Sequence, residues 1–537
     1  MPLFYRSFYQ RGWLALAWVG LLAGGCARRN YFLPDSRVGA TATAPLPATT
    51  DSVRVAAGRH YSQHSDLYYL FLGRHYRPVW AAPVTVPVLR LATVVPGGLR
   101  PGKAGGGFQS ISMTLEGKQD REYALRALDK DPAKTLPKVL RATFLLNVVR
   151  DATSAANPYA ALTVPPLARA AGVPHTRPQL VYVRPDETGL GPGSERFQGK
   201  VALLEEKYEE LASRTPDLAG ATNFVGGETV LKKTYYQPAG YLDQPAFLRA
   251  RLLDLLLGDW DRHERQWDWA AFPEANSRTR YQPIPKDRDQ VYFRFDDGLV
   301  PWLASRRFIA PQFHTFRASY GYLPGLIYQA EFIDRRGLSQ LKRADFQRIA
   351  ADLQRRLPDS VIERAMRRLP PAVFALEGAR LGGALKTRRQ HLPRAADEFY
   401  QLLAREPNLG GSAQAERFVV RRFADSTTVQ VFSSARHAPT TADTLRFRRT
   451  YFTAETRTLL LDGLDGDDIF DVTTTGGGRP IRLRLYGGTG QDQLLRQGNA
   501  RHLRLYPDEA SDLTAAQSER PYLSRRRHTP AERTAEN

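Results

Sequence analysis

The sequence predicts an α+β protein in which a large mixed region precedes a smaller β-rich module. Between residues 336 and 405, apolar residues recur at helical spacing, as at Phe346, Ile349 and Leu353. Past residue 410, apolar and polar residues alternate with a period of two, which is typical of strands. Because 42% of the 537 residues are hydrophobic, the chain can bury a large core, which excludes a disordered protein.

The charge and the cysteine content exclude several classes of function. The 76 basic residues exceed the 55 acidic ones and give a formal net charge of +21, but only 12 of the basic residues are lysines. The 64 arginines are spread along the chain without a basic block, so we expect a solvated surface and no nucleic-acid partner. A single cysteine, Cys26, excludes internal disulfides and metal sites that need several thiolates.

The amino terminus predicts export and attachment to a membrane. An apolar stretch over residues 13–23, too short to span a bilayer, ends in Ala-Gly-Gly before Cys26. This segment resembles the lipobox of bacterial lipoprotein signal peptides. The resemblance implies a signal peptide over 1–25, lipidation of Cys26 and an extracytoplasmic protein anchored to a membrane, with the outer membrane expected. An ordinary signal peptide, or a buried helix with a free thiol, is the alternative. Residues 26–55 contain few large apolar residues and indicate a flexible tether.

The region from 56 to 297 mixes strands and helices. A Gly-rich segment at 105–109 stands before an alternating apolar run, which favours a loop between two strands. Asp243 is a candidate N-cap of an apolar helix that ends at Gly258, and a charged loop follows. Further helices are expected over 137–150 and 158–171, further strands over 180–183 and 200–206, and a strand, turn and strand over 281–293.

Two charged segments carry the candidate chemistry. The first, 258–266, presents Asp261, His263 and Gln266 after the helix ends, and the second, 284–290, presents Asp287 and Asp289 after a strand. Two carboxylates and an amide oxygen on neighbouring loops would hold a divalent cation and orient a hydroxyl group. Phosphoryl transfer needs such groups, because positioning and charge neutralisation do most of its work.

These segments resemble the catalytic and metal-binding loops of atypical kinases, which include phosphatidylinositol kinases, HipA-like kinases and secretory-pathway kinases. The resemblance covers about 105–297 and implies a two-lobed kinase-like domain over 56–405, with a small lobe at about 85–206 and a large lobe at about 207–405. It implies Mg or Mn with ATP as cofactors. By position, Asp261 and His263 match catalytic-loop residues, and Gln266, Asp287 and Asp289 match metal ligands. The nucleotide-binding residues would be Gly105, Gly106, Gly107, Gln109 and a basic residue, with Lys130 favoured and Arg126 its rival.

The sequence departs from the kinase pattern in ways that keep an alternative open. No Lys stands in the middle of a strand where the phosphate-binding Lys belongs, and Gln266 replaces the more frequent Asn. The loops could also be solvated surface turns. The layout of the chain resembles the soluble region that precedes the β-barrel of some outer-membrane surface-antigen proteins. The alternative is therefore a non-catalytic protein of the cell envelope that uses a pseudokinase-like fold for binding or assembly.

The β-rich module over 410–506 contains two similar G-x-x-G-x-D turns. Gly463, Gly466 and Asp468 recur as Gly487, Gly490 and Asp492, 24 residues further on. The second copy resembles the calcium-binding repeat of β-rolls, which makes Asp468 and Asp492 candidate calcium ligands. Stacked turns without a metal are the alternative. Residues 507–537 are expected to be a disordered tail, and His60 with His64 form a further candidate metal pair that lacks an evident carboxylate partner.

Overall fold

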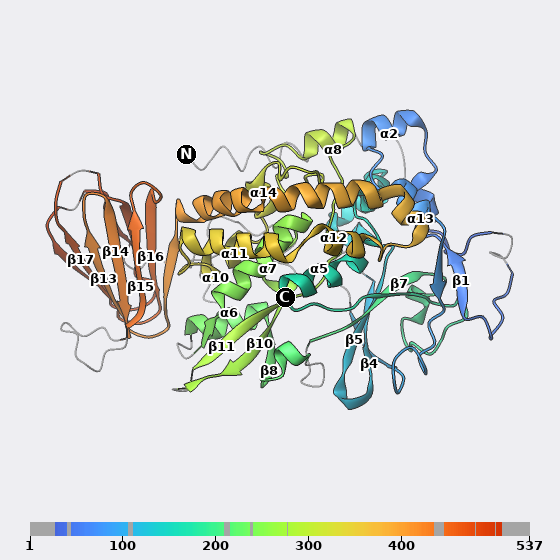
Figure 1. Ribbon diagram of the computed structural model, residues 1–537, viewed down its shortest axis with the longest axis horizontal. Helices are drawn as coiled ribbons and strands as arrows, with labels where there is room; N and C mark the ends of the chain where they lie inside the picture. The colour runs from blue at the N-terminus through green and yellow to red at the C-terminus, as the bar shows by residue number, and fades with distance from the viewer. Residues whose placement is uncertain are drawn as a thin grey trace.

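The computed structural model describes residues 27–39, 44–105, 111–208, 215–236, 240–275, 278–433, 445–477, 479–499 and 501–506. It is a mixed α+β protein with several sheets and a β-rich carboxy-terminal region, which confirms the predicted class (Figure 1). In these ranges no helix combines the length and the apolar character that crossing a membrane requires. The predicted signal peptide, Cys26, the central Gly-rich residues and the predicted tail lie outside the described residues.

The segment before residue 90 contains packed structure that the sequence did not predict. Strand β1 (Ser52–Val55) pairs antiparallel with β2 (Val84–Pro87), and helices α2 (Asp66–Leu72) and α3 (Arg77–Ala81) lie between them. The segment expected to be a flexible tether contains packed residues, because Val53 and Val55 are buried against β2 and the buried Arg37 bridges to Val55. Two valines at alternate positions suffice for a short strand once a partner strand from elsewhere in the chain covers them.

The first large sheet has five antiparallel strands in the order β3-β4-β5-β7-β6. Its inward side chains, among them Leu115, Leu125 and Leu204, form one buried cluster. The Gly-rich segment lies between β3 and β4, and the strands predicted over 180–183 and 200–206 are present. The strands are β3 (Arg100–Gly105), β4 (Ser112–Glu116), β5 (Glu122–Ala127), β6 (Gln179–Tyr182) and β7 (Val201–Glu206).

Two helices connect β5 to β6. Helix α5 (Val164–Ala171) begins with prolines in its first turn and ends at Gly172 in the left-handed conformation, as its sequence favours. The helix predicted over 137–150 is α-helical only as α4 (Leu145–Asp151). Thr143 is extended and separates α4 from a short 3-10 turn, so the apolar spacing there does not continue one helix.

The second sheet carries the charged segments. Its four strands run in the order β8-β10-β11-β9, and helix α7 (Gln244–Leu257) packs beside it. Asp243 caps α7 by accepting a hydrogen bond from the backbone N–H of Ala246, and α7 stops at Gly258 as predicted. The elements are β8 (Asn223–Gly226), α6 (Gly227–Tyr236), β9 (Gly240–Leu242), β10 (Trp267–Pro273) and β11 (Thr279–Pro285).

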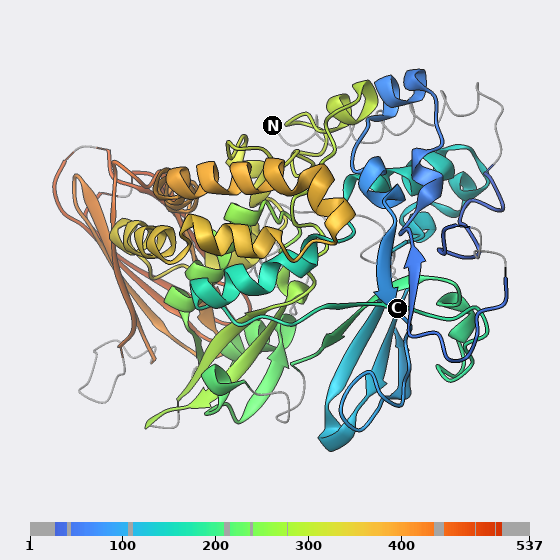
Figure 2. The ribbon, with the colours of Figure 1, turned by 45° about the vertical axis from the view of Figure 1, so that its right-hand side comes forward.

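A helical layer follows between residues 299 and 404. In α11 (Arg343–Arg356), the predicted apolar positions Phe346, Ile349 and Leu353 are all buried. Figure 1 shows α11, α12 and the long α14 running across the molecule above the second sheet, and Figure 2 shows the helices above both sheets. The other helices are α8 (Leu299–Ala304), α9 (Leu323–Leu326), α10 (Glu331–Gly337), α12 (Asp359–Met366), α13 (Pro371–Val373) and α14 (Ala379–Ala404).

The carboxy-terminal module, orange to red in Figure 1, consists of two sheets packed face to face. From β16 onward, successive strands alternate between the sheets and stack in parallel on the preceding turn of chain. Tyr400 of α14 donates to Glu455 at 2.7 Å, which helps to fix the module against the helices. The strands are β12 (Asn408–Ser412), β13 (Arg417–Arg422), β14 (Ser426–Phe432), β15 (Leu445–Phe452), β16 (Thr458–Leu464), β17 (Ile469–Thr474), β18 (Arg482–Tyr486), β19 (Gln493–Gln497) and β20 (Leu503–Tyr506).

Candidate functional site

The two charged segments meet at one end of the β10–β11 hairpin. The register pairs Trp267 with Pro285, so the loop before β10 and the loop after β11 leave the sheet side by side. The backbone N–H of Lys286 donates to the carbonyl of Gln266 at 3.1 Å. The hairpin therefore brings together Asp261, His263 and Gln266 from one loop with Asp287 and Asp289 from the other, as the sequence predicts for a common site.

The buried side chain of Arg262 holds the two loops together. Its guanidinium donates to the carbonyl oxygens of Lys286 at 2.7 Å and of Gln266 at 2.9 Å, and to Asp254 at 3.2 Å. The side chain is fully buried and lies over the ring of Trp267, 4.6 Å from its centre. A planar group with donors in several directions can bridge two backbone segments in this way, which a lysine could not do.

Arg288 makes the matching contacts from the second loop. It donates to Asp254 and, at 3.1 Å, to Asp259, and all three side chains are buried. Arg251 completes the set by pairing with Asp254 at 2.8 Å and with Asp334 at 2.6 Å. The three arginines and the three aspartates of this network thus balance one another in formal charge. Because removal of one partner from such a buried pair leaves an uncompensated charge, this buried network fixes the loop positions strongly.

Asp287 stands at the centre of the candidate site in a left-handed backbone conformation, with φ of +55°. Aspartate tolerates this conformation better than most residues. Burial alone would raise the pKa of Asp287, but Arg126, Lys130 and Arg262 together with a hydrogen bond from the Gln266 side chain hold that pKa below its ordinary value. Asp287 is therefore ionised at neutral pH.

Asp261 has the opposite electrostatic character. Burial and the negative charges of Asp289 and Asp287 raise its pKa to about 7. His263 lies beside it, with Nε2 3.8 Å from an Asp261 carboxylate oxygen. Because Nδ1 of His263 accepts the backbone N–H of Arg265 at 3.2 Å, a neutral His263 carries its proton on Nε2, the nitrogen nearer to Asp261. Asp261 can therefore exchange a proton near neutral pH, as a general base must.

Lys130 and Arg126, the two basic residues that the sequence favours, reach the carboxylates of this site from the first sheet. Lys130, just past β5, forms an ion pair with Asp289. Arg126, on β5, pairs with Glu205 of β7 and lies close enough to Asp287 and Asp289 to feel their charge. Burial alone would lower the pKa of Lys130, but Asp289 and Asp287 outweigh it and raise that pKa. The structure thus places both candidates for the basic nucleotide-binding residue at the site.

The described end of the Gly-rich segment lies in the same part of the first sheet. Gly105 pairs with Ser112, and Ser112 pairs with Arg126, so the segment leaves the sheet at the strand position of Arg126. Gly106, Gly107 and Gln109 lie outside the described residues.

The donor set fits a hard divalent cation in its chemistry. Asp287 and Asp289 offer carboxylate oxygens and Gln266 offers an amide oxygen, which are the donors that Mg²⁺ prefers. Burial, followed by the charges of Asp289 and Asp287, raises the pKa of Asp261 beside these donors. Over the described ranges, no three His, Cys, Asp or Glu side chains are already grouped to hold a metal ion.

Sequence reasoning missed the residues that build the site rather than line it. Arg262 and Arg288 occupy the centre of two Asp-Arg motifs, DRH and DRD, and that shared feature is the signal that could have found them. Glu205 is 6% exposed and accepts hydrogen bonds from Arg126 and from Thr176 at 2.9 Å. The only sign of Glu205 in the sequence was that an acidic residue stands at the end of an apolar strand.

The two repeated turns of the carboxy-terminal module stack directly on each other. Strands β17 and β19 pair Ile469 with Gln493, exactly one repeat apart. Asp492 accepts the backbone N–H of Asp468 at 2.9 Å, and Asp468 accepts that of Glu416 at 2.7 Å. A Cβ atom on Gly463 would stand 2.0 Å from the Asp468 carboxylate, so the repeat needs glycine there. The carboxylates therefore serve as links between turns, whether or not calcium binds.

The pair His60 and His64 does have carboxylate neighbours. Nε2 of His60 is 3.7 Å from Asp129, and Nε2 of His64 is 3.3 Å from Asp151. Burial lowers the pKa of His60 to about 4. Asp151 is committed to Arg77, to which it binds through both oxygens at 2.6 and 2.5 Å. The cluster is accordingly a buried structural junction in this part of the described chain.

The comparisons with known proteins assign no family to this chain. No family model matches the sequence, and no curated protein is similar to it. The functional argument therefore depends on the geometry above and on the resemblance of short motifs.

Proposed function

We propose that the chain is a metal-dependent phosphotransferase of the cell envelope whose region 56–405 has the two-lobed arrangement of atypical kinases. One observation carries the proposal. Lys130 and Arg126 of the first sheet reach the carboxylates of Asp287 and Asp289, which follow the second sheet. Separate parts of the chain thus supply the cationic and the anionic groups of one site. Transfer of a phosphoryl group requires both kinds of group.

The residues take the following roles in this proposal. Asp261 would accept the proton of the attacking hydroxyl group, with His263 orienting its carboxylate. Lys130 and Arg126 would bind phosphate oxygens, as would the backbone of the Gly-rich segment 105–109. Gln266, Asp287 and Asp289 would hold Mg²⁺ or Mn²⁺.

The nucleotide and metal ion, when bound, supply the phosphoryl group and neutralise its charge. The protein's own contribution is to keep the loops in place, which the Arg262 and Arg288 contacts do. The ion pair of Lys130 with Asp289 would have to be exchanged when a cation binds Asp289. Each side chain is a fifth to a quarter exposed, so the exchange would take place at a partly buried pair.

A screen of nucleotides with Mg²⁺ and Mn²⁺ by thermal unfolding of the full chain tests the proposal. We expect a rise in melting temperature that needs both metal and nucleotide and disappears in Asp287→Ala. Asp186→Ala serves as the matched control, because Asp186 is an exposed residue whose ion pair, within the described ranges, is with the neighbouring Arg184. A full screen without any metal-dependent shift would refute phosphotransfer.

A second function is favoured by the internal pairing of the site. Lys130 binds Asp289, Arg126 binds Glu205, and Gln266 donates to Asp287. Groups that satisfy one another need no ligand, which suits a non-catalytic envelope protein that binds or assembles with another protein. In that case the nucleotide screen is negative, and Asp261→Ala leaves the phenotype of the cell unchanged.

Attachment to the membrane is part of the same proposal. The segment before Cys26 supports an exported lipoprotein, with the lipid on Cys26 and the remaining chain outside the cytoplasm. Mass spectrometry of the amino-terminal peptide from the native membrane should show a diacylated or triacylated cysteine. Cys26→Ser should release the chain from the membrane fraction.

A further inference from the structure

Exposed apolar side chains gather on two short helices, α2 and α8, and on the turn after α8. Among the described residues, fifteen large hydrophobic side chains are exposed, and nine of them lie in these segments. Leu67 is 66% exposed, Trp302 47% and Phe308 64%, so the surface is truly open in the isolated chain. The nine residues, called the apolar platform below, are Leu67, Leu70, Phe71, Leu299, Val300, Trp302, Leu303, Phe308 and Ile309.

The platform is one surface because α2 and α8 are clamped together. Figures 1 and 2 both show the two helices side by side along the top edge of the molecule. A Cβ atom on Gly298, just before α8, would stand 2.2 Å from the backbone nitrogen of Gly73, just after α2. Only glycine permits this approach. The two helices are thus positioned from segments more than 200 residues apart in sequence.

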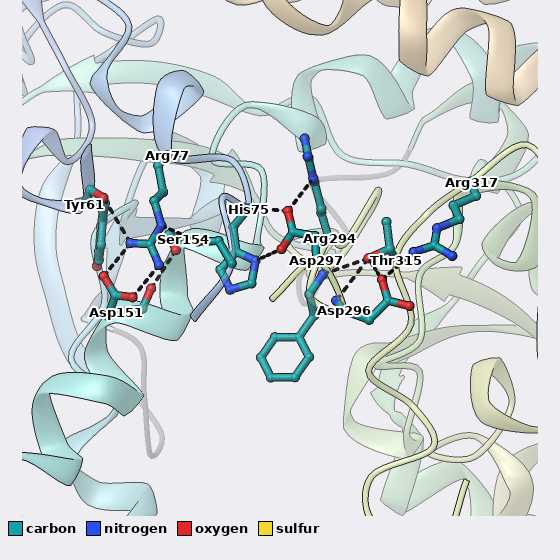
Figure 3. A network of polar contacts seen from close by, with 12 residues as sticks. Tyr61, His75, Arg77, Asp151, Ser154, Arg294, Asp296, Asp297, Thr315 and Arg317 are labelled. Atoms are coloured by element: carbon teal, nitrogen blue, oxygen red, sulfur yellow. Dashed lines mark hydrogen bonds and ion pairs between the residues drawn. The ribbon is translucent and has the colours of Figure 1, made fainter. Parts of the chain in front are cut away.

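Charged groups behind the platform lock that arrangement (Figure 3). Asp297 accepts the backbone N–H of His75 at 2.8 Å and pairs with the His75 ring at 2.6 Å. Arg294 also donates to Asp297, at 3.0 Å. His75 is 2% exposed and stacks on Phe295, with ring centres 5.7 Å apart. These contacts of His75 and Asp297 lie inside the molecule, whereas the apolar side chains of the platform face the solvent. In an ordinary core, the apolar side chains are the buried ones.

The segment of chain that contains α8 and the turn after it carries basic but no acidic residues. From Gly298 to Ala330 the chain contains no Asp or Glu, but it contains Arg306, Arg307 and Arg317. Arg306 lies over the ring of Trp302, 4.2 Å from its centre. Arg307 and Arg317 are both exposed, and Arg317 pairs with Asp296 at 2.8 Å. Asp66, paired with Arg74 at 3.6 Å, is the acidic residue of α2.

We propose that the apolar platform docks on the surface of an anionic lipid bilayer. Leucine, phenylalanine and tryptophan side chains on short helices enter the boundary between headgroups and acyl chains, where Trp is favoured. Arginines at the edge bind lipid phosphates, and each basic residue near an anionic surface adds to the attraction. The platform would then set the orientation of the whole protein on the membrane, since the clamp makes α2 and α8 one rigid surface.

Quenching of Trp302 by brominated lipids tests this docking directly on the full chain. Vesicles contain phosphatidylcholine and phosphatidylglycerol with bromine in the acyl chains. Trp80, Trp260, Trp267 and Trp269 are buried, and Trp13 and Trp18 lie outside the described residues. A Trp302→Phe variant therefore identifies the share of quenching that belongs to Trp302. We expect Trp302 to be quenched, and quenching to weaken when phosphatidylglycerol is left out.

A double variant, Leu67→Glu with Leu303→Glu, should lower vesicle affinity of the platform by at least about tenfold, because two buried leucines are lost. In the free chain both leucines are exposed, and only docking would bury them in the bilayer, so the variant should melt at the wild-type temperature. Phe452→Glu, 50% exposed on the distant β15, is the matched control and should bind like the wild type. Unquenched Trp302 on vesicle-bound chain would overturn the proposal. So would a dimer, seen by light scattering, that only the double variant dissociates.

Discussion

Two regions of the molecule contain clusters of carboxylates. The carboxylates have different kinds of partner in the two regions. At the candidate site, Asp289 is paired with Lys130, a side chain that can move away. In the carboxy-terminal turns, Asp468 accepts the backbone N–H of Glu416, the residue just before β13. The difference indicates that the first region can exchange its partners for a ligand, whereas the second uses its carboxylates to hold the fold.

The largest expected effect comes from removing a fixed partner at the candidate site. Arg288→Ala leaves Asp254 and Asp259 without one of their buried cations. We expect the free energy of unfolding to fall by about 3–5 kcal/mol, measured by urea denaturation. Arg355→Ala, which breaks an exposed pair with Asp352 on the same helix, is the control and should cost at most about 1 kcal/mol. A cost as small for Arg288→Ala would show that the loops do not depend on the buried network.

The second effect concerns the fixed carboxylate of the turns. Burial raises the pKa of Asp468 to about 9, and one of its oxygens has no hydrogen-bond partner in the described structure. Because the folded state binds this proton more tightly than the unfolded state, stability should fall as pH rises from about 4 to 9.

Asp468→Asn separates this contribution from that of other groups. The amide oxygen can still accept the Glu416 N–H, and the titration is gone. Hydrogen exchange of β16 to β19 across this pH range should show a flatter dependence in the variant than in the wild type. Calcium that raises the stability of the wild type alone would instead favour the metal interpretation of Asp468 and Asp492. Identical pH dependence in both proteins would contradict the assigned role.

The smallest effect concerns the proton on Asp261. Its pKa of about 7 is raised mainly by burial and then by Asp289 and Asp287. A cation bound to those carboxylates would lower this pKa, so Mg²⁺ binding at pH 7 should release up to about half a proton. Calorimetry in buffers of different ionisation enthalpy measures this number. Asp261→Asn should abolish the release, and a release that persists in the variant would assign the proton to another group.

The sequence could predict elements that depend on local signals. The N-cap Asp243 and the stop at Gly258 define α7, and the spacing of Phe346, Ile349 and Leu353 defines α11. The sequence also predicted that the two charged loops share one site, but it did not predict the hairpin that joins them. A second strand was expected up to residue 293, whereas β11 ends at Pro285. The candidate site was accessible to sequence reasoning to this extent.

Other features depend on contacts between distant segments and left little trace in the sequence. The pairing of β1 with β2, the convergence of Arg126 and Lys130 on one site, and the Gly73–Gly298 contact are of this kind. Arg262 and Arg288 resembled ordinary surface charges in a chain with 64 arginines. Only their burial and their carboxylate partners distinguish them.

Binding of a non-hydrolysable ATP analogue with Mg²⁺, measured by calorimetry on the full chain, tests the central claim most directly. If the ion pair of Lys130 and Asp289 belongs to a phosphate- and metal-binding site, the wild type binds the analogue only with Mg²⁺. Lys130→Met and Asp287→Ala should then each weaken binding at least tenfold, while Asp468→Asn binds normally. Absence of metal-dependent binding in the wild type, or equal affinity in all four proteins, would contradict the account.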